Sequence, residues 1–538
     1  MATNKLLKYA AGKAIRRLSV ALLCIGFACP AGAQANDFDI LIKGGVVVDG
    51  SGGPRFDADV AIRGDRIVFV GNVPSDATAD KIINATGRVV APGFIDPHSH
   101  AAPGIETAEL AAAGPILYQG ITTVMINPDG GGPADLKPQI DNIKRNEPGV
   151  NVVPLIGHNG VRRAVMQIED RSPTDAEQAA MERLVREAME TGAFGLSTGP
   201  FYVPGKYSTT EEIIGLARVA ADFPNSFHIS HIRDESSYDV GVIGAIEEVI
   251  RITRETRLPG VVTHMKMLGP HVWGKSKEAI RVIDAARAEG LEIWADQYPY
   301  SASGSGLQPA LVPGWAQAGG EEEMIARLEN PEQVKELRPE MAENLERRAG
   351  PNAVMIRDYP PEPEYVGKRL DDIAGLREEE PLDTAIEMLK NGGAPIISFN
   401  MDEHDLEAIM RQPWTMTSSD GSLITPGERL NHPRAYGAFP RKIKRYVLDS
   451  GILTLEQAIH SSSCLTAKVF SIEDRGLIRA GYFADVLVIN LDTLKDHATY
   501  QKPEILSEGM DYVIVNGRTA IGAGKLAPDR SGRVLLRE

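Results

Sequence analysis

The feature that most constrains this chain is the alternation of short apolar runs with amphipathic segments over residues 93–470. Runs such as GITTVMIN, NVVPLIG, GAFGLST, SFHISH, GVVTHMK, LEIWADQYPY, APIISFN and WTMTSSD are typical of buried strands. Between them, stretches such as DAEQAAMERLVREAMET carry apolar residues at helical spacing. Repeated strand–helix units of this length predict an α/β fold, with a parallel sheet closed as a (β/α)8 or TIM barrel.

Strand-like segments flank this predicted barrel on both sides. Residues 38–91 alternate apolar and polar residues between Gly, Asp and Asn turns. The same pattern returns over residues 471–538, in ADVLVINLD, DYVIVNGRTAIGAGKL and GRVLLRE. The two segments predict one small β-sandwich built from both ends of the chain. The catalytic barrel is then expected over residues 92–470, with a charged helical insertion near residues 315–360.

Residues 1–33 have the layout of a secretory signal peptide. Five positive side chains precede the apolar stretch LSVALLCIGFA, and the small residues AGA follow, so cleavage is expected after Ala33. A membrane anchor is the alternative, but this apolar run is shorter than the roughly 20 residues that a span needs. The Arg16-Arg17 pair leaves twin-arginine export open beside the general route. The expected location is the periplasm or the medium.

Removal of the signal changes the charge and the cysteine content of the chain. The formal net charge moves from −16 to −21, because the signal carries five positive and no negative side chains. Such an acidic protein disfavours nucleic acid and anionic lipid as partners, and no later apolar run approaches the length of a membrane span. Cys24 and Cys29 leave with the signal, so Cys464 alone remains and neither an internal disulfide nor a cysteine-rich zinc site is expected.

Histidines and carboxylates gather at the ends of the predicted barrel strands. His98 and His100 in PGFIDPHSH are two residues apart, so on a strand both point to the same face. Barrel enzymes place their reactive groups at the C-terminal strand ends. The candidate metal ligands at these ends are His98, His100, Asp129, His231, His264 and Asp420. Each histidine alone is compatible with a structural role, but together with two carboxylates they predict a zinc site.

The sequence resembles the N-acyl-D-amino-acid deacylases (D-aminoacylases) of the amidohydrolase superfamily over nearly the whole chain after the signal. The motifs that carry the resemblance include PGFIDPHSH, GAFGLSTGPFYVPGKYST, HIRDES, THMK, ADQYPYSASGSGL, SSDG and NHPRAYGAFPR. The resemblance implies a zinc hydrolase. In it, His98, His100 and Asp420 hold one metal position, and His231 and His264 hold the other.

The resemblance also implies that Lys266, Tyr298 and Arg434 bind the carboxylate of the substrate. Lys266 lies two residues past a ligand and so shares its face. An arginine can bind a carboxylate through two parallel hydrogen bonds. The alternative for Arg434 is an ion pair with an acidic neighbour. His158, which ends an apolar run, is a further candidate for the pocket, and Tyr298 or His158 is expected to stabilise the oxyanion.

One position departs from the pattern of the deacylases. In GITTVMINPDG, Asp129 stands where these enzymes carry a cysteine ligand. Many other amidohydrolases bridge two metals with a carboxylated lysine on a middle strand, but GAFGLSTG has no lysine, and Lys206 follows too far beyond the strand. Asp129 is therefore the candidate bridge, and the site is expected to hold one or two zinc ions.

The expected activity is metal-dependent hydrolysis of a linear amide bond in a small molecule with a free carboxylate. An N-acyl-D-amino acid would yield a carboxylate and a free D-amino acid, with Asp420 as general base and then general acid. A dipeptidase or a cyclic-amide hydrolase would use the same metal chemistry. A carbohydrate hydrolase would need paired carboxylates without the histidines. A non-catalytic periplasmic binding protein would need no metal.

Overall fold

A parallel barrel forms the centre of the computed structural model, which describes residues 37–537. The predicted signal peptide lies outside the described residues. Within them, eight successive strand positions run in parallel, because β9 and β10 are separated only by Leu155 and continue one strand. The barrel strands are β6 (Phe94–Asp96), β8 (Ile121–Ile126), β9 (Asn151–Pro154) with β10 (Ile156–Gly157), β11 (Leu196–Thr198), β12 (His228–Ser230), β13 (Gly260–Val262), β14 (Ile293–Gln297) and β18 (Thr415–Thr417).

The first and last barrel strands meet through a short parallel pair just beyond their C-terminal ends. β7 (Ser99–His100) pairs with β19 (Gly421–Ser422). The backbone N–H of Asp420 donates to the carbonyl oxygen of His98 over 2.9 Å. The carboxylate of Asp96 accepts the backbone N–H groups of His98 and Ser419 over 3.2 and 3.0 Å. The closure of the barrel therefore fixes two of the predicted metal-binding segments against each other.

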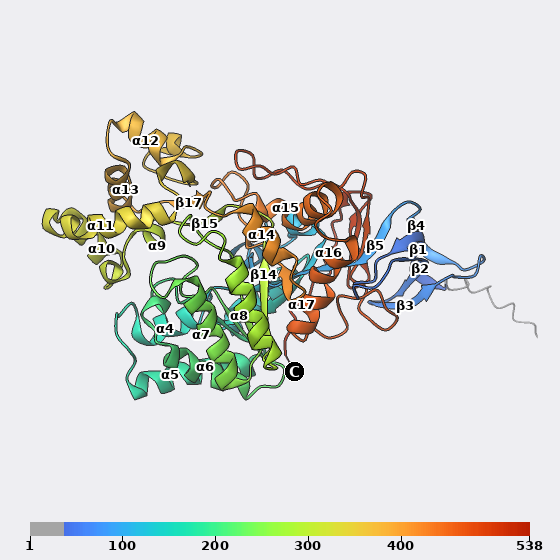
Figure 1. Ribbon diagram of the computed structural model, residues 1–538. Helices are drawn as coiled ribbons and strands as arrows, with labels where there is room; N and C mark the ends of the chain where they lie inside the picture. Colours follow the sequence, from blue (N-terminus) through green and yellow to red (C-terminus); the bar gives the residue numbers. More distant parts are fainter. Residues whose placement is uncertain (1–36, 538) are drawn as a thin grey trace, which may run out of the picture.

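Helices cover the outside of the barrel between successive strands (Figure 1). The sequence explains α5 (Asp175–Glu190) directly: Thr174 and Glu177 form a capping box at its start, and Met181 and Val185 bury one face. The other helices around the barrel are α2 (Gly114–Leu117), α3 (Lys137–Arg145), α4 (His158–Met166), α6 (Thr210–Ala221), α7 (Gly241–Thr256), α8 (Ser276–Ala288), α14 (Glu403–Met410), α15 (Arg434–Arg441), α16 (Leu455–Ser461) and α17 (Cys464–Val469).

The two ends of the chain come together, as the flanking strand patterns predicted, but in the described residues their nine strands are hydrogen-bonded as one sheet, where a β-sandwich was expected. β5 joins them, because it pairs in parallel with β1 and antiparallel with β20. The strands are β1 (Phe38–Val47), β2 (Phe56–Arg63), β3 (Arg66–Gly71), β4 (Ala79–Asn84), β5 (Val89–Pro92), β20 (Val486–Ile489), β21 (Met510–Val515), β22 (Arg518–Gly522) and β23 (Lys525–Leu526). One face of this sheet forms a core of its own. The other face, which includes Leu487, Met510 and Val513, packs in one core with barrel residues such as Ile121 and Val124.

The last apolar segment, GRVLLRE, does not join this sheet. Val534 forms a parallel bridge with Val152 of β9, and Leu535 donates its N–H to the carbonyl of Val152 over 2.8 Å. Apolar and polar residues alternate in this segment as they do in the strands of the terminal sheet. Its apolar side chains instead pack against the barrel, because an edge of β9 is available there. The expected place of this segment in the terminal sheet is therefore wrong.

The insertion is larger than the helical segment predicted near residues 315–360. It starts with β15 (Ser303–Gly306), ends with β17 (Pro395–Ser398), and lies between barrel strands β14 and β18. APIISFN was expected as a barrel strand, but β17 pairs antiparallel with β15 and β16 (Val354–Ile356) and belongs to the insertion. The insertion helices are α9 (Leu307–Leu311), α10 (Glu321–Glu329), α11 (Pro331–Arg347), α12 (Leu370–Arg377) and α13 (Pro381–Lys390).

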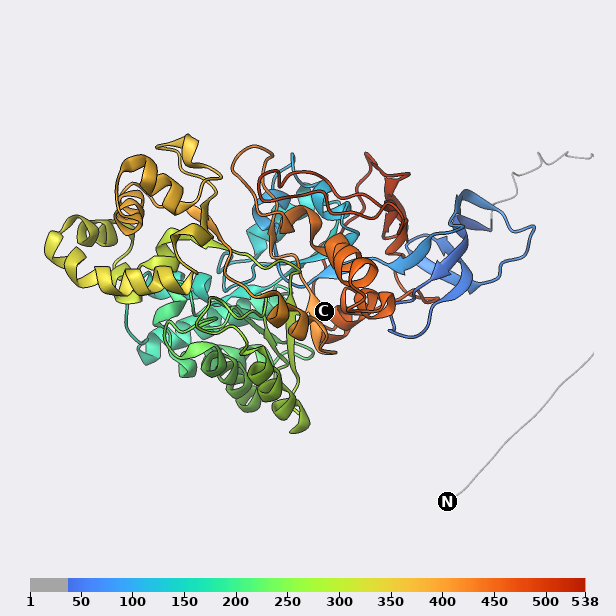
Figure 2. The same ribbon diagram turned by 45° about the horizontal axis from the view of Figure 1, so that its top comes forward.

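The insertion and the terminal sheet occupy opposite ends of the molecule. Figures 1 and 2 both show the yellow helices of the insertion on one side of the barrel and the blue strands β1–β5 on the other. No helix within residues 37–537 has both the length and the apolar character needed to cross a bilayer.

A lysine lies in the core behind the last barrel strand. Lys442, at the start of the π-helix η5 (Lys442–Asp449), is 2% exposed. Its ammonium donates to the hydroxyls of Thr417 and Ser461 over 2.6 and 2.9 Å. Burial lowers the pKa of Lys442 to about 7. The folded protein therefore holds this proton more weakly than the unfolded chain does.

Burial of the charged ammonium of Lys442 destabilises the folded state, because the pKa of Lys442 is lower there than in the unfolded chain. This destabilisation is largest below pH 7 and disappears as the pH rises toward 10.5. We expect the free energy of unfolding to rise by about 2–3 kcal/mol between pH 6 and pH 9 through this group, at about 1.4 kcal/mol per pKa unit. Urea unfolding of the wild type and of Lys442→Met at both pH values measures it. The same pH increment in both proteins would contradict the assignment.

Candidate metal centre and substrate cavity

Asp129 lies at the meeting point of all four candidate histidine ligands. Its carboxylate oxygens are each 3.2 Å from a ring nitrogen, Oδ1 from Nε2 of His98 and Oδ2 from Nε2 of His100. Oδ1 is also 3.4 Å from Nε2 of His264 and 3.6 Å from Nδ1 of His231. These side chains follow β6, β8, β12 and β13, so the parallel register of the barrel brings them to one end.

The ligand atoms form two groups that share Asp129. Asp420 completes the first, with Oδ1 at 3.1 Å from Nε2 of His100 and 3.7 Å from Nε2 of His98. The first group consists of His98, His100, Asp129 and Asp420; the second consists of Asp129, His231 and His264. The structure therefore brings together all six residues that the sequence nominated as ligands.

The donor atoms in these groups fit divalent cations. Nε2 of His98 and Oδ1 of Asp129 are buried and, among the described residues, have no hydrogen-bond partner. Nδ1 of His231 and Nε2 of His264 face each other over 2.9 Å. Imidazole nitrogens and carboxylate oxygens are zinc ligands, and buried atoms of this kind are costly without a partner. The residues present therefore fit one zinc ion in each group.

The charges of the cluster favour ionised carboxylates. Burial opposes ionisation of Asp129, but the imidazoles of His98 and His100 outweigh it and hold the pKa of Asp129 well below its usual range. For Asp420 the guanidinium of Arg434 outweighs burial in the same way and lowers the pKa. Both carboxylates therefore stay charged in the buried site, in the form in which a carboxylate binds a cation.

Three ligands sit on backbone that few side chains adopt. Asp129, His264 and Asp420 have φ of +56°, +34° and +49°. Left-handed backbone is uncommon outside glycine, although Asp and His tolerate it better than most residues. Such conformations cluster at functional sites, where the surrounding fold maintains them. Here each one turns a side chain inward directly after a barrel strand.

Glu235 is a site residue that was not singled out from the sequence. It pairs with the ammonium of Lys266, and its Oε1 is 3.0 Å from Nδ1 of His264. Burial opposes ionisation of Glu235, but the charge of Lys266 lowers its pKa overall. The carboxylate therefore fixes the ring of His264 from behind, as outer partners of metal-binding histidines do. The signal available was its position in HIRDES, four residues after His231.

A cavity of about 440 Å³ opens over the ligands. Of the predicted substrate-binding residues, Lys266, Tyr298 and Arg434 line it. Nη1 of Arg434 is 2.8 Å from Oδ2 of Asp420, and the guanidinium lies 4.7 Å from the centre of the Tyr298 ring. Arg434 thus forms the ion pair that was the alternative to its binding the substrate, and its partner, Asp420, is a candidate metal ligand.

Of the four predicted substrate-binding residues, His158 is the one that does not line this cavity. It begins α4, is fully buried, and its Nε2 lies 2.8 Å from Oε1 of Glu212. Arg162 contacts the same carboxylate oxygen over 3.2 Å. The strand before His158 does end at the barrel mouth, but the helix begins at once and its first turn directs the imidazole toward α6. This corrects the expected place of His158.

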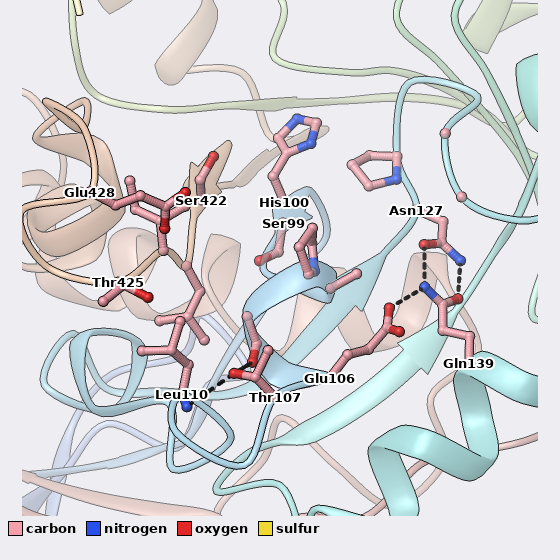
Figure 3. Close-up of a pocket in the computed structure, with 18 of the residues that line it drawn as sticks. Ser99, His100, Glu106, Thr107, Leu110, Asn127, Gln139, Ser422, Thr425 and Glu428 are labelled. Carbon is pink, nitrogen blue, oxygen red and sulfur yellow. Dashed lines mark hydrogen bonds between the residues drawn. The ribbon is translucent and has the colours of Figure 1, made fainter. Parts of the chain in front are cut away.

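A second cavity of about 470 Å³ adjoins the first and shares His100 and Ser422 with it. Figure 3 shows Glu106 and Asn127 on either side of Gln139, whose amide nitrogen lies 2.8 Å from Glu106 and whose oxygen accepts from Asn127 over 2.8 Å. These polar groups satisfy one another. The rest of the wall combines the apolar side chains Ala102, Pro103, Leu110, Leu423 and Ile424 with the charged side chains Glu428 and Arg429.

Comparisons with known proteins agree with this geometry. The model of the Amidohydrolase family matches residues 81–521. The chain is 36% identical to N-acyl-D-glutamate deacylase and 33% identical to D-aminoacylase, both from Alcaligenes xylosoxydans xylosoxydans. The alignments cover 93% and 94% of this chain and 97% and 99% of those proteins.

Two similar solved structures are also deacylases. N-acyl-D-glutamate deacylase of Bordetella bronchiseptica, solved with zinc and a phosphonate mimic of the tetrahedral intermediate, is similar with a TM-score of 0.79 and 33% identity, over 93% of this chain and 99% of that one. A D-aminoacylase studied for its binuclear metal centre also has a TM-score of 0.79, at 32% identity, over 93% of this chain and 100% of that one. The chain therefore belongs to the N-acyl-D-amino-acid deacylases of the amidohydrolase family.

Proposed function

We propose that this protein hydrolyses the amide bond of N-acyl-D-amino acids, releasing a carboxylate and a free D-amino acid. The observation that carries the proposal is the pair of zinc-ligand groups sharing Asp129 below a cavity lined by buried cations. The similar proteins named above, which act on N-acyl-D-amino acids according to their names, support the choice of substrate.

Asp420 carries the proton transfers in this reaction. When bound, zinc polarises the amide carbonyl and lowers the pKa of a bound water toward neutrality. Asp420 accepts the proton of the attacking water and then delivers it to the leaving nitrogen, so that the C–N bond breaks to a carboxylate and an amine. Asp420 is suited to this because Arg434 and His100 hold its carboxylate ionised and in place at the cavity floor.

Tyr298 is the group we assign to the tetrahedral intermediate. It lines the cavity and is 1% exposed. Burial raises the pKa of Tyr298 well above its usual value, so the hydroxyl stays protonated and can donate to the developing oxyanion. The free α-carboxylate of the substrate is assigned to Arg434 and Lys266, which lie on the same cavity wall as Tyr298.

Zinc content and substrate range test this proposal together. We expect protein purified without added metal to contain zinc. A chelator should abolish hydrolysis, because it removes the zinc on which the reaction depends, and added zinc should restore it. Amine release from matched N-acetyl-D- and N-acetyl-L-amino acids and from dipeptides measures the activity. Zinc-free protein whose activity is indifferent to the chelator would contradict the metal assignment, and cleavage confined to dipeptides would contradict the deacylase assignment.

We also propose that the protein is exported. The support is the charged, apolar and small-residue layout of residues 1–33, with a cleavage site after Ala33. N-terminal sequencing of the protein recovered from the periplasm or the medium tests this, and a mature chain that still begins at Met1 would contradict it.

A further inference from the structure

We propose that the second cavity, beside His100, binds the acyl group of the substrate and accepts linear aliphatic acyl groups longer than acetyl. This inference rests on the proposed function, because it concerns the acyl half of the same N-acyl-D-amino acid. The amino-acid half stays in the cavity over the metal ligands (the metal cavity), with Lys266, Tyr298 and Arg434. The acyl half is assigned to a part of the site that has no other role in the reaction.

The second cavity begins at the reacting centre. Nε2 of His100 lies 3.1 Å from Oδ1 of Asp420 and 3.2 Å from Oδ2 of Asp129, and the same imidazole lines both cavities. The residues that line both cavities are His100, Pro128, Gly131 and Ser422. A chain attached to a carbonyl carbon at these ligands can therefore enter the second cavity directly.

The two cavities meet at Gly131, where a side chain is missing. Apart from its chain neighbours, a Cβ on residue 131 would meet within 4 Å only the carbonyl oxygen of Pro128, at 3.1 Å. Because Gly131 lines both cavities, the absent side chain leaves room at their junction. A larger residue here would narrow the passage that an acyl chain has to use.

The geometry of an amide sends its two halves apart. The carbonyl group is planar, so its nitrogen and its acyl carbon leave the carbonyl carbon in different directions. Lys266, Tyr298 and Arg434 line the metal cavity, and none of these three lines the second cavity. When they hold the amino-acid half, the acyl carbon points away from them, and the second cavity is the space that adjoins the ligands at His100.

The apolar wall of the second cavity suits an aliphatic chain. It consists of Ala102, Pro103, Leu110, Leu423 and Ile424. Ala102 and Leu423 belong to one buried core cluster, and the half-buried Leu110 packs against that cluster, so the wall is held in place. The cavity has a volume of about 470 Å³. A chain of several carbons covers this wall and removes apolar surface from water, whereas the single methyl of an acetyl group covers little of it.

The charged side chains of this cavity do not call for an ionic acyl group. Glu428 and Arg429 carry opposite charges, so together they favour neither an anionic nor a cationic chain, and Glu428 is exposed to solvent. The carboxylate of Glu106 accepts from the amide of Gln139 over 2.8 Å. Figure 3 shows this pair on one side of the cavity and Leu110 on the other. The apolar wall is therefore available to a chain without charge.

The experiment measures kcat/KM for one D-amino acid that carries an acetyl, a butanoyl or a hexanoyl group. We expect kcat/KM to rise with chain length, by up to about fourfold for each methylene group that leaves water. Free hexanoate should also inhibit the wild type at a lower concentration than acetate does, because both products occupy the acyl position. This second measurement needs no variant.

Leu110→Asn tests whether the longer chain lies in the second cavity. Asparagine is close to leucine in size but replaces its methyl groups by an amide, so the ratio of hexanoyl to acetyl kcat/KM should fall by about three- to tenfold. Gly131→Val, which narrows the passage, should lower the same ratio. The matched control is Leu184→Asn, since Leu184 is a half-buried leucine of α5 that packs on another core and lines neither cavity. This control should keep the wild-type ratio.

Equal wild-type kcat/KM for the acetyl and hexanoyl substrates would overturn the inference and leave the deacylase function standing. A preference for hexanoyl that survives both Leu110→Asn and Gly131→Val would also overturn it, because the longer chain would then bind elsewhere. Absence of hydrolysis with every N-acyl-D-amino acid would instead overturn the proposed function, and the inference with it.

Discussion

Asp420→Asn is expected to lower kcat by roughly 10²- to 10⁴-fold, the contribution of a positioned general acid–base group. An amide nitrogen or oxygen cannot take the proton of the attacking water and return it to the leaving nitrogen. The loss should appear in kcat, because Asp420 is assigned to the proton transfers and does not itself bind the substrate carboxylate. Steady-state hydrolysis of an N-acetyl-D-amino acid, with zinc measured in the same sample, tests this expectation.

Asp405→Asn provides the control for loss of a buried negative charge. Asp405 is 4% exposed and accepts from the backbone of Gly274 and the hydroxyl of Ser276, away from the cavity. It should retain the wild-type kcat because Asp405 does not line the metal cavity, although an amide keeps only one of the two acceptor oxygens. If Asp420→Asn contains full zinc and still has a kcat close to that of the wild type, another residue carries the proton transfers.

Asp129→Asn is expected to weaken zinc binding by more than the roughly 10- to 100-fold that loss of an outer-shell partner costs. The reason is that both ligand groups contain Asp129, so one substitution removes a charged donor from each. Asn is the appropriate replacement because residue 129 has φ of +56°, which Asn adopts as readily as Asp. Zinc stoichiometry and a chelator-competition titration provide the measurement.

Asp129→Cys provides the rescue. The deacylases that the sequence resembles carry a cysteine at this position, and a thiolate is a zinc ligand. This variant should recover zinc affinity that Asp129→Asn loses. Asp135→Asn, an exposed carboxylate shortly after it in the same loop, should bind zinc as the wild type does. Unaltered zinc content in Asp129→Asn would place Asp129 in the cavity wall instead of the metal shell.

The barrel and its ligands were predictable because both depend on short-range patterns. A strand buried on both faces must be apolar throughout, as in β8, where all six residues are buried. Ligands follow such strands directly, so His98, His100, His231 and His264 were found by where their strands end. Parallel strands share one C-terminal edge, and this alone predicts that the six ligands meet.

The insertion was only partly predictable, for a physical reason. β17 is as apolar as a barrel strand, and its composition does not reveal its partner. It pairs with β15 and β16 because those strands are held beside it by the insertion helices. GRVLLRE is a similar case, since alternation specifies a strand face but not the sheet edge that it meets.

The sequence by itself determined the barrel, the strands of the terminal sheet and the six candidate ligands, because strand periodicity and strand order are local and repeated. Only the tertiary structure decided which charges pair. It joined Lys266 to Glu235 and Arg434 to Asp420, and turned His158 toward Glu212. Such pairings join residues far apart in the sequence and depend on distances of a few ångströms, because Coulomb energy and desolvation change steeply over that range.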